Sequence, residues 1–203
     1  MRTRTLLLAA AALAAGLATS SAQVYSQNVV GYMNVTAPQG FSIIANQLNS
    51  TNNSIGSLIP SPNNGSIVYK FVNGVLTANN YFFSWTDPNM TLNPGEGVIF
   101  YNAGPGGSTF TFVGEVKQGT LSTQLPAGFS IISSQVPQAG LISTDLGMPI
   151  PNNGDIVYQG GTFTANNYFF GWSGGEPNLG VGEAVLTYKT AAQTWTRNFT
   201  VGP

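Results

Sequence analysis

The sequence predicts an all-β fold with two homologous antiparallel modules, and three observations support this class. Short runs of β-branched and aromatic residues, such as SIVYKF, GVIFYN and STFTFVGEV, are bounded by Gly, Pro and Asn along the chain. The string TANNYFFSW at residues 77–85 returns as TANNYFFGW at residues 164–172. No helical pattern that could link parallel strands separates the runs, so each module is predicted to be an antiparallel sandwich or barrel.

Residues 1–22 are predicted to form the helix of a cleaved secretory signal peptide. Arg2 and Arg4 precede an apolar run that is too short to span a bilayer comfortably, and small residues follow, so we expect cleavage before Gln23. The C-terminal FTVGP contains neither an apolar tail nor a basic cluster. We therefore expect a secreted protein, located outside the cell, on its surface or in the periplasm, with no transmembrane segment in the mature chain.

The composition of the chain limits the kinds of molecule that the protein is expected to bind. Residues 23–203 carry four Lys or Arg and seven Asp or Glu, a net charge of −3, so no basic patch for nucleic acid is expected. Charged residues make up only 6% of the chain, and such weakly charged surfaces favour association. Self-assembly, or attachment to an extracellular matrix or glycan, is therefore the expected kind of interaction. There is no Cys, so the fold must rely on burial and hydrogen bonds.

The repeat extends over the whole chain after the signal peptide. PQGFSII returns as PAGFSII, and PNNGSIVY returns as PNNGDIVY, in the same order as the aromatic string. The joint between the copies contains no Pro-rich or Gly-rich linker, so we expect the modules to pack against each other with pseudo-twofold symmetry. The predicted organisation is a signal peptide at 1–22, a lead-in at 23–27, a first β module at 28–115 and a second at 116–203.

Differences in length between the modules mark the turns. VYKFVNGVLTAN becomes VYQGGTFTAN, which is two residues shorter. Asn73-Gly74 predicts a tight hairpin, and Gly160-Gly161 replaces it because both pairs tolerate φ > 0. One short helical turn is expected in each of NNSIGSLI and QAGLISTDLG.

The repeated aromatic string has two interpretations. In an extended strand Tyr81, Phe83 and Trp85 share one face, and exposed rings in a row could stack on sugars. Core is the favoured interpretation for Phe83, Trp85, Phe170 and Trp172, because large rings supply most of the burial in a module without disulfides. The ends of the two strings, beside paired asparagines, form the first candidate ligand-binding surface: Asn79, Asn80, Tyr81, Asn166, Asn167 and Tyr168.

Repeated acids form the second candidate site. Asp87 in DPN aligns with Glu176 in EPN, and Glu96 in PGEG aligns with Glu183 in VGEA. Paired carboxylates could serve glycoside hydrolysis or, together with Asn side chains, calcium binding. A structural role is favoured, in which each carboxylate accepts backbone N–H bonds in a turn, because calcium loops concentrate more acids and a glycosidase uses one cleft.

Several strings also resemble a group of exported bacterial proteins without a characterised activity. These strings are QVYSQNVVGYMNV, TDPNMTLNPGEGVIF, FVGEVKQGTL and PAGFSIISSQVPQAG, and they cover nearly all of the predicted mature chain. The resemblance implies secretion and two tandem all-β units, and it implies no catalytic activity.

The sequence gives little support for other kinds of catalysis or for metal and haem binding. The chain has no His and no Cys, which removes the commonest general base, the thiol nucleophile and the usual zinc and haem ligands. No catalytic residue, metal or cofactor is predicted. The expected function is therefore that of a non-enzymatic protein of the cell envelope or extracellular matrix that acts by binding or assembly. Carbohydrate binding is the alternative, and glycan hydrolysis by the repeated acids is the third possibility.

Overall fold

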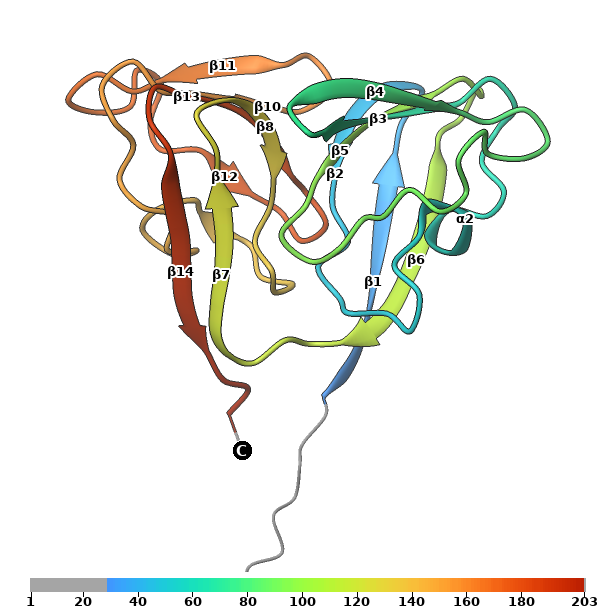
Figure 1. The fold of residues 1–203 in the computed structure, drawn as a ribbon, viewed down its shortest axis with the longest axis horizontal. Helices are drawn as coiled ribbons and strands as arrows, with labels where there is room; N and C mark the ends of the chain where they lie inside the picture. Colours follow the sequence, from blue (N-terminus) through green and yellow to red (C-terminus); the bar gives the residue numbers. More distant parts are fainter. Residues whose placement is uncertain (1–28, 203) are drawn as a thin grey trace, which may run out of the picture.

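The computed structural model describes residues 29–202, which form two similar units of antiparallel sheet and confirm the predicted fold class (Figure 1). The predicted signal peptide, its cleavage site and the lead-in lie outside the described residues. Within the described part of the chain, no helix is long and apolar enough to cross a membrane.

Both units combine a four-stranded sheet with a two-stranded ribbon. The first contains β1 (Val30–Ala37), β2 (Gly40–Ile44), α2 (Ile55–Leu58), β3 (Ile67–Val72), β4 (Val75–Asn80), β5 (Val98–Asn102) and β6 (Ser108–Glu115). The second contains β7 (Gly119–Leu125), β8 (Gly128–Ile132), β9 (Gly140–Leu141), β10 (Ile156–Gln159), β11 (Thr164–Asn167), β12 (Asn178–Leu179), β13 (Val185–Lys189) and β14 (Gln193–Phe199). The sheets have the equivalent orders β2-β5-β3-β4 and β8-β13-β10-β11, and the ribbons are β1-β6 and β7-β14.

Each ribbon packs on one face of its own sheet. Buried and exposed residues alternate along β6, as expected for a strand with one face on the core, and Phe110 and Phe112 point inward. The ring of Phe110 lies 5.2 Å from that of Phe100 in the sheet. Trp195 occupies the equivalent position in the second unit, where its indole N–H donates to Leu146 O at 2.9 Å.

The hairpin predicted at Asn73-Gly74 is present, whereas the one predicted at Gly160-Gly161 has a longer turn. Asn73 and Gly74 have φ of 52° and 80°, and this two-residue turn joins β3 to β4 with Val72 opposite Val75. In the second unit the turn runs over residues 160–163, with positive φ at Gly160 (65°) and Phe163 (53°) but not at Gly161, so β10 and β11 are shorter. Of the two expected helical turns, the first is α2, whereas the second segment forms β9 followed by a run of turns.

The two sheets pack against each other through the faces that their ribbons leave free. Ile43, Ile99, Ile131 and Ala184 belong to a buried cluster between the units. Four backbone hydrogen bonds also join the units: Ala45 N to Gly182 O (2.9 Å), Ser133 N to Gly95 O (3.0 Å), Ala184 N to Ile43 O (3.2 Å) and Gly97 N to Ile131 O (3.1 Å). The expectation that the modules pack together is confirmed.

These bonds reveal the symmetry of the contact. The bond from Ala45 and the bond from Ser133 occupy equivalent positions of the two units, and so do the bonds from Ala184 and Gly97. Each unit thus presents the same donors and acceptors to the other, which is the reciprocity of a twofold interface. A Cβ on Gly97 would lie 2.5 Å from Ala184 Cβ, so this close approach requires a residue without a side chain.

Two equivalent glutamines beside this contact differ in the hydrogen bonds that their side-chain amide groups donate. Gln135 Nε2 donates to Ser122 O at 2.7 Å and to Thr123 Oγ1 at 2.9 Å. Its counterpart Gln47 is fully buried, and Gln47 Nε2 has no hydrogen-bond partner among the described residues. Val35 stands at the position equivalent to Thr123, so the acceptor hydroxyl is missing in the first unit.

We expect Val35→Thr to stabilise the protein by about 1 kcal/mol, because the new hydroxyl gives the buried Gln47 amide an acceptor. Thr123→Val should destabilise by less than about 1 kcal/mol, because it removes one acceptor from Gln135 but leaves the bond to Ser122 O. Urea unfolding of both variants and the wild type measures the two changes. A Val35→Thr variant less stable than the wild type would contradict this account of the orphaned amide.

Candidate functional site

The repeated aromatic string forms a tight reversal of the chain in each unit. Tyr81 bridges Trp85, and Phe82, Phe83 and Ser84 make the bend between them. The N–H of Phe82 donates to Ser84 O at 3.0 Å. Residues 168–172 repeat this geometry, with the N–H of Phe169 donating to Gly171 O at 2.9 Å. We call Phe82 and Phe83 tip 1, and Phe169 and Phe170 tip 2.

The second phenylalanine of each tip has an unusual backbone conformation. Phe83 and Phe170 have φ of 63° and 58°, in the left-handed region that costs an L-residue about 1–2 kcal/mol. Side chains of the repeated PNNG motif hold both residues there: Asn64 Oδ1 accepts the N–H of Phe83 at 2.8 Å, and Asn153 Oδ1 accepts that of Phe170 at 2.7 Å. The PNNG and YFF motifs are therefore parts of one local structure.

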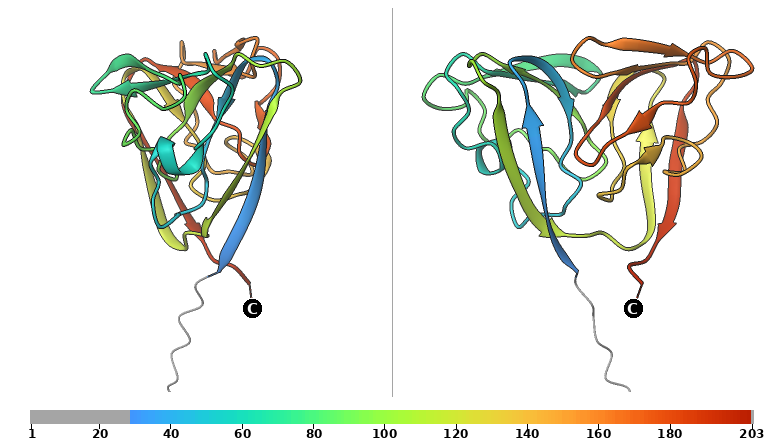
Figure 2. Two further views of the ribbon diagram at one scale, coloured as in Figure 1. Left: turned by 90° about the vertical axis from the view of Figure 1, so that its right-hand side faces the viewer. Right: turned by 180° about the vertical axis from the view of Figure 1, so that it is seen from behind.

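The four rings are among the most exposed apolar side chains of the protein. Phe82 and Phe83 are 70% and 79% exposed, and Phe169 and Phe170 are 70% and 85% exposed. Within each tip the two rings lie nearly perpendicular, with interplanar angles of 89° and 88°. The loops that follow β4 and β11 lie at opposite ends of the long axis of the molecule, as Figures 1 and 2 show.

The prediction that Phe83 and Phe170 belong to the core is wrong. That prediction assumed an extended strand, in which every second side chain shares a face, whereas the chain reverses at these residues. Trp85 is buried as predicted, and Trp172 is half-buried against the second core. The signal available in the sequence was the single difference between the two strings, Ser against Gly, which falls at the bend.

The six predicted ligand-binding residues lie at the base of the tips, with different exposures. Tyr81 and Asn79 are buried, and Asn79 holds a turn by donating to Asp87 O at 2.6 Å and accepting from Asp87 N at 2.9 Å. In the second unit Tyr168 and Asn166 are half-buried. The two members of the set with exposed side chains are Asn80 and Asn167.

Each of the four repeated acids accepts a backbone N–H. The acceptor atoms are Asp87 Oδ1 for Asn89 N (3.0 Å), Glu96 Oε2 for Asn93 N (2.7 Å), Glu183 Oε2 for Gly180 N (2.8 Å) and Glu176 Oε1 for Thr144 N (2.7 Å). Burial raises the pKa of Glu176, but hydrogen bonds from Thr144 and Ser143 lower it more, so its pKa lies below the ordinary value.

Asp87 and Glu176 do not occupy equivalent positions, contrary to the alignment of DPN with EPN. Ile55 N bonds to Met90 O, and the equivalent Ile142 N bonds to Pro177 O. Pro177 therefore corresponds to Met90, whereas the alignment of DPN with EPN had paired it with Pro88. The loops before these residues differ in length, which shifts the alignment by two residues.

Two grooves of similar size flank the contact between the units. Groove 1, of about 580 Å³, lies between segments 70–74, 94–97 and 122–132. Groove 2, of about 660 Å³, lies between segments 34–44, 159–162 and 181–184. Their lining segments are equivalent, so the grooves are pseudo-symmetry copies of each other. Glu96 lines the first and Glu183 the second, so these two acids do not share one cleft.

Within residues 29–202 no cluster of three or more acidic side chains is suited to hold a metal ion. Comparisons of the chain with protein-family models, curated proteins and solved structures found no match. The resemblance to exported bacterial proteins thus stays a prediction.

Proposed function

We propose that the protein is a secreted, non-enzymatic component of the cell envelope or extracellular matrix that assembles end to end through its two aromatic tips. The observation that carries this proposal is the pair of exposed phenylalanines kept in a costly backbone conformation in both units. Strained, exposed residues of this kind are expected where a binding contact offsets their cost.

The area of a tip indicates how it would act. Two phenylalanine rings at these exposures offer roughly 300 Å² of apolar surface, well below the ~800 Å² per partner of a stable interface. A single tip-to-tip contact is therefore weak. Tips at opposite ends let each molecule bind two neighbours, so that an array is held by many such contacts. Perpendicular rings also provide no flat platform for a sugar, which favours contact between tips.

The repeated acids support a non-enzymatic role. Each carboxylate already accepts a backbone N–H, and the two acids beside the grooves lie in different grooves. A retaining or inverting glycosidase needs two carboxyl groups on either side of one bond, at roughly 5–10 Å from each other.

A valency experiment tests the proposal. Residues 23–203 are compared with variants in which tip 1 (Phe82→Ser, Phe83→Asn), tip 2 (Phe169→Ser, Phe170→Asn) or both tips are replaced. Asn tolerates the left-handed conformation, so we expect the tip variants to fold with equal or up to about 1 kcal/mol greater stability. By sedimentation, the wild type should form open-ended oligomers that grow with concentration. Single-tip variants should stop at dimers, and the double-tip variant should be monomeric. A wild type that stays monomeric, or equal association of all four proteins, would overturn the proposal.

A further inference from the structure

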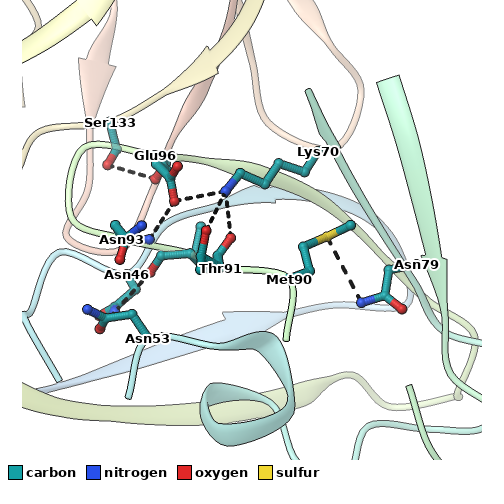
Figure 3. Close-up of polar contacts among 10 residues, drawn as sticks. Asn46, Asn53, Lys70, Asn79, Met90, Thr91, Asn93, Glu96 and Ser133 are labelled. Carbon is teal, nitrogen blue, oxygen red and sulfur yellow. Dashed lines mark hydrogen bonds and ion pairs between the residues drawn. The ribbon is translucent and has the colours of Figure 1, made fainter. Parts of the chain in front are cut away.

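The two grooves differ at one position that determines their charge. In groove 1 Lys70 Nζ lies 2.9 Å from Glu96 Oε2 and also donates to Thr91 O at 2.7 Å (Figure 3). The Lys70 side chain is mostly buried, at 11% exposure. Groove 1 therefore contains a carboxylate whose charge is balanced by an ammonium group from the protein itself.

Groove 2 lacks this ammonium group. Gln159 stands at the position of Lys70, and its Nε2 donates to Asn178 O at 2.9 Å, the counterpart of the bond from Lys70 to Thr91 O. Gln159 Oε1 accepts from Asn166 Nδ2 at 3.2 Å. Glu183, the counterpart of Glu96, is exposed and forms no ion pair within the described residues. The carboxylate is retained, and the cation that neutralises it in the other copy is absent.

From this internal comparison we propose that groove 2 binds a glycan that carries a free amino sugar, whose ammonium group pairs with the Glu183 carboxylate and supplies the positive charge that Lys70 supplies to Glu96 in groove 1. The volume of the groove is within the ~300–1,000 Å³ of small-molecule sites, which occur preferentially between domains. The site lies apart from the aromatic tips and does not depend on the assembly proposed above.

The lining of groove 2 favours a sugar as the carrier of the ammonium group. Hydroxyl and amide side chains suited to sugar hydroxyls line it, and the ring of Phe41, 42% exposed, offers an apolar face. These polar side chains are Asn34, Thr36, Gln39 and Thr162.

A lysine-bearing peptide fits less well, because the free edge of β2 is blocked where such a peptide would add a strand. Gly161 lies so close to Phe41 that a Cβ on the glycine would be 1.9 Å from Phe41 O. The hairpin of the second unit therefore covers the backbone carbonyl that a bound peptide would use.

Binding should be weak at a single site, because an exposed ion pair contributes little and the rest of the affinity comes from polar contacts. We expect dissociation constants on the order of millimolar for a tetramer of β-1,4-linked glucosamine. The N-acetylated tetramer has the same rings without the charge, and should bind about three- to fivefold more weakly or not at all. A tetralysine peptide, which supplies the ammonium group without a sugar, should not exceed the acetylated tetramer.

The experiment is an NMR titration of residues 23–203 with these three probes. Chemical-shift changes from the glucosamine tetramer should map to groove 2. Glu183→Gln should weaken its binding about three- to fivefold, and Gln159→Lys should do the same by placing an internal ammonium beside Glu183. Glu115→Gln, which removes an equal charge outside both grooves, is the control and should leave binding unchanged.

Three results would overturn the proposal. The first is equal binding of the free and acetylated tetramers, and the second is an unchanged affinity in Glu183→Gln. The third is an equal loss of affinity in Glu183→Gln and Glu115→Gln, which would mean unspecific attraction to an acidic protein. Stronger binding of tetralysine than of the glucosamine tetramer would instead assign the groove to a peptide. Because the tips are intact in all these variants, failure here leaves the assembly proposal unaffected.

Discussion

Asp155→Asn is expected to destabilise the protein by about 3–5 kcal/mol, because it leaves one member of a buried ion pair without its partner. Asp155 and Lys189 form an ion pair in which both side chains are almost fully buried, at 1% and 2% exposure. Asp155 Oδ1 also accepts the N–H of Thr190 at 2.7 Å. Removal of the carboxylate charge leaves the Lys189 ammonium buried without an anion, and urea unfolding measures the loss.

The first unit provides a matched control for this pair. Ser66 and Asn102 occupy the positions of Asp155 and Lys189, and the N–H of Ala103 donates to Ser66 Oγ at 3.3 Å, as Thr190 N does to Asp155. The double variant Asp155→Ser, Lys189→Asn transfers this neutral arrangement to the second unit. It should recover most of the stability lost in Asp155→Asn. A double variant as unstable as the single one would show that the buried charge is not the cause.

The same pair predicts how stability depends on pH. Burial raises the pKa of Asp155, but hydrogen bonds from Lys189, Thr190 and Asn152 lower it more, so its pKa in the folded protein lies below the ordinary value. A lowered folded pKa contributes stability that is present above the unfolded value of about 3.9 and is lost as the pH falls through the folded pKa. The double variant should lack this component of acid unfolding, as unfolding curves from neutral to acidic pH would reveal.

Trp85→Ala is also expected to cost about 3–5 kcal/mol. The ring is 5% exposed and lies 5.2 Å from that of Tyr81. Its indole N–H donates to Ile59 O at 2.7 Å, so truncation leaves both a cavity and a buried carbonyl without its partner. Chemical denaturation measures the change.

The equivalent Trp172 provides the comparison. It is half-buried, and its ring lies 5.3 Å from that of Tyr168, so we expect a smaller loss of about 1–3 kcal/mol for Trp172→Ala. Trp85→Phe keeps most of the ring but removes the N–H, so its loss of stability should be smaller than that of Trp85→Ala and larger than that of Trp172→Ala. Equal losses at Trp85 and Trp172 would contradict the difference in burial on which the prediction is based.

Local and repeated features of the fold could be predicted from the sequence, whereas features that depend on distant contacts could not. The hairpin at Asn73-Gly74 follows from two residues that tolerate φ > 0, and the two units follow from the repeated strings. The tips escaped prediction because strand alternation was applied across a bend. The repeated strings align Lys70 with Gln159, but the sequence does not place either side chain in a groove beside a glutamate.

The contact between the units has a consequence for how the two copies can change. Its four symmetric hydrogen bonds use backbone atoms and do not depend on side-chain chemistry. Other bonds across it do use side chains, since Gln47 Oε1 accepts the N–H of Gly182 and Ser133 Oγ donates to Glu96 O. In a dimer of separate identical chains every substitution appears on both sides of the axis. Here one continuous chain carries both halves, and a substitution alters one side alone. Three pairs of equivalent positions have diverged in this way. They hold Val35 and Thr123, Lys70 and Gln159, and the pair Ser66 with Asn102 in place of Asp155 with Lys189. Because the two halves are fused, one unit can keep a side chain that the other has lost. The effect of that side chain can then be found by comparing equivalent positions of the two units.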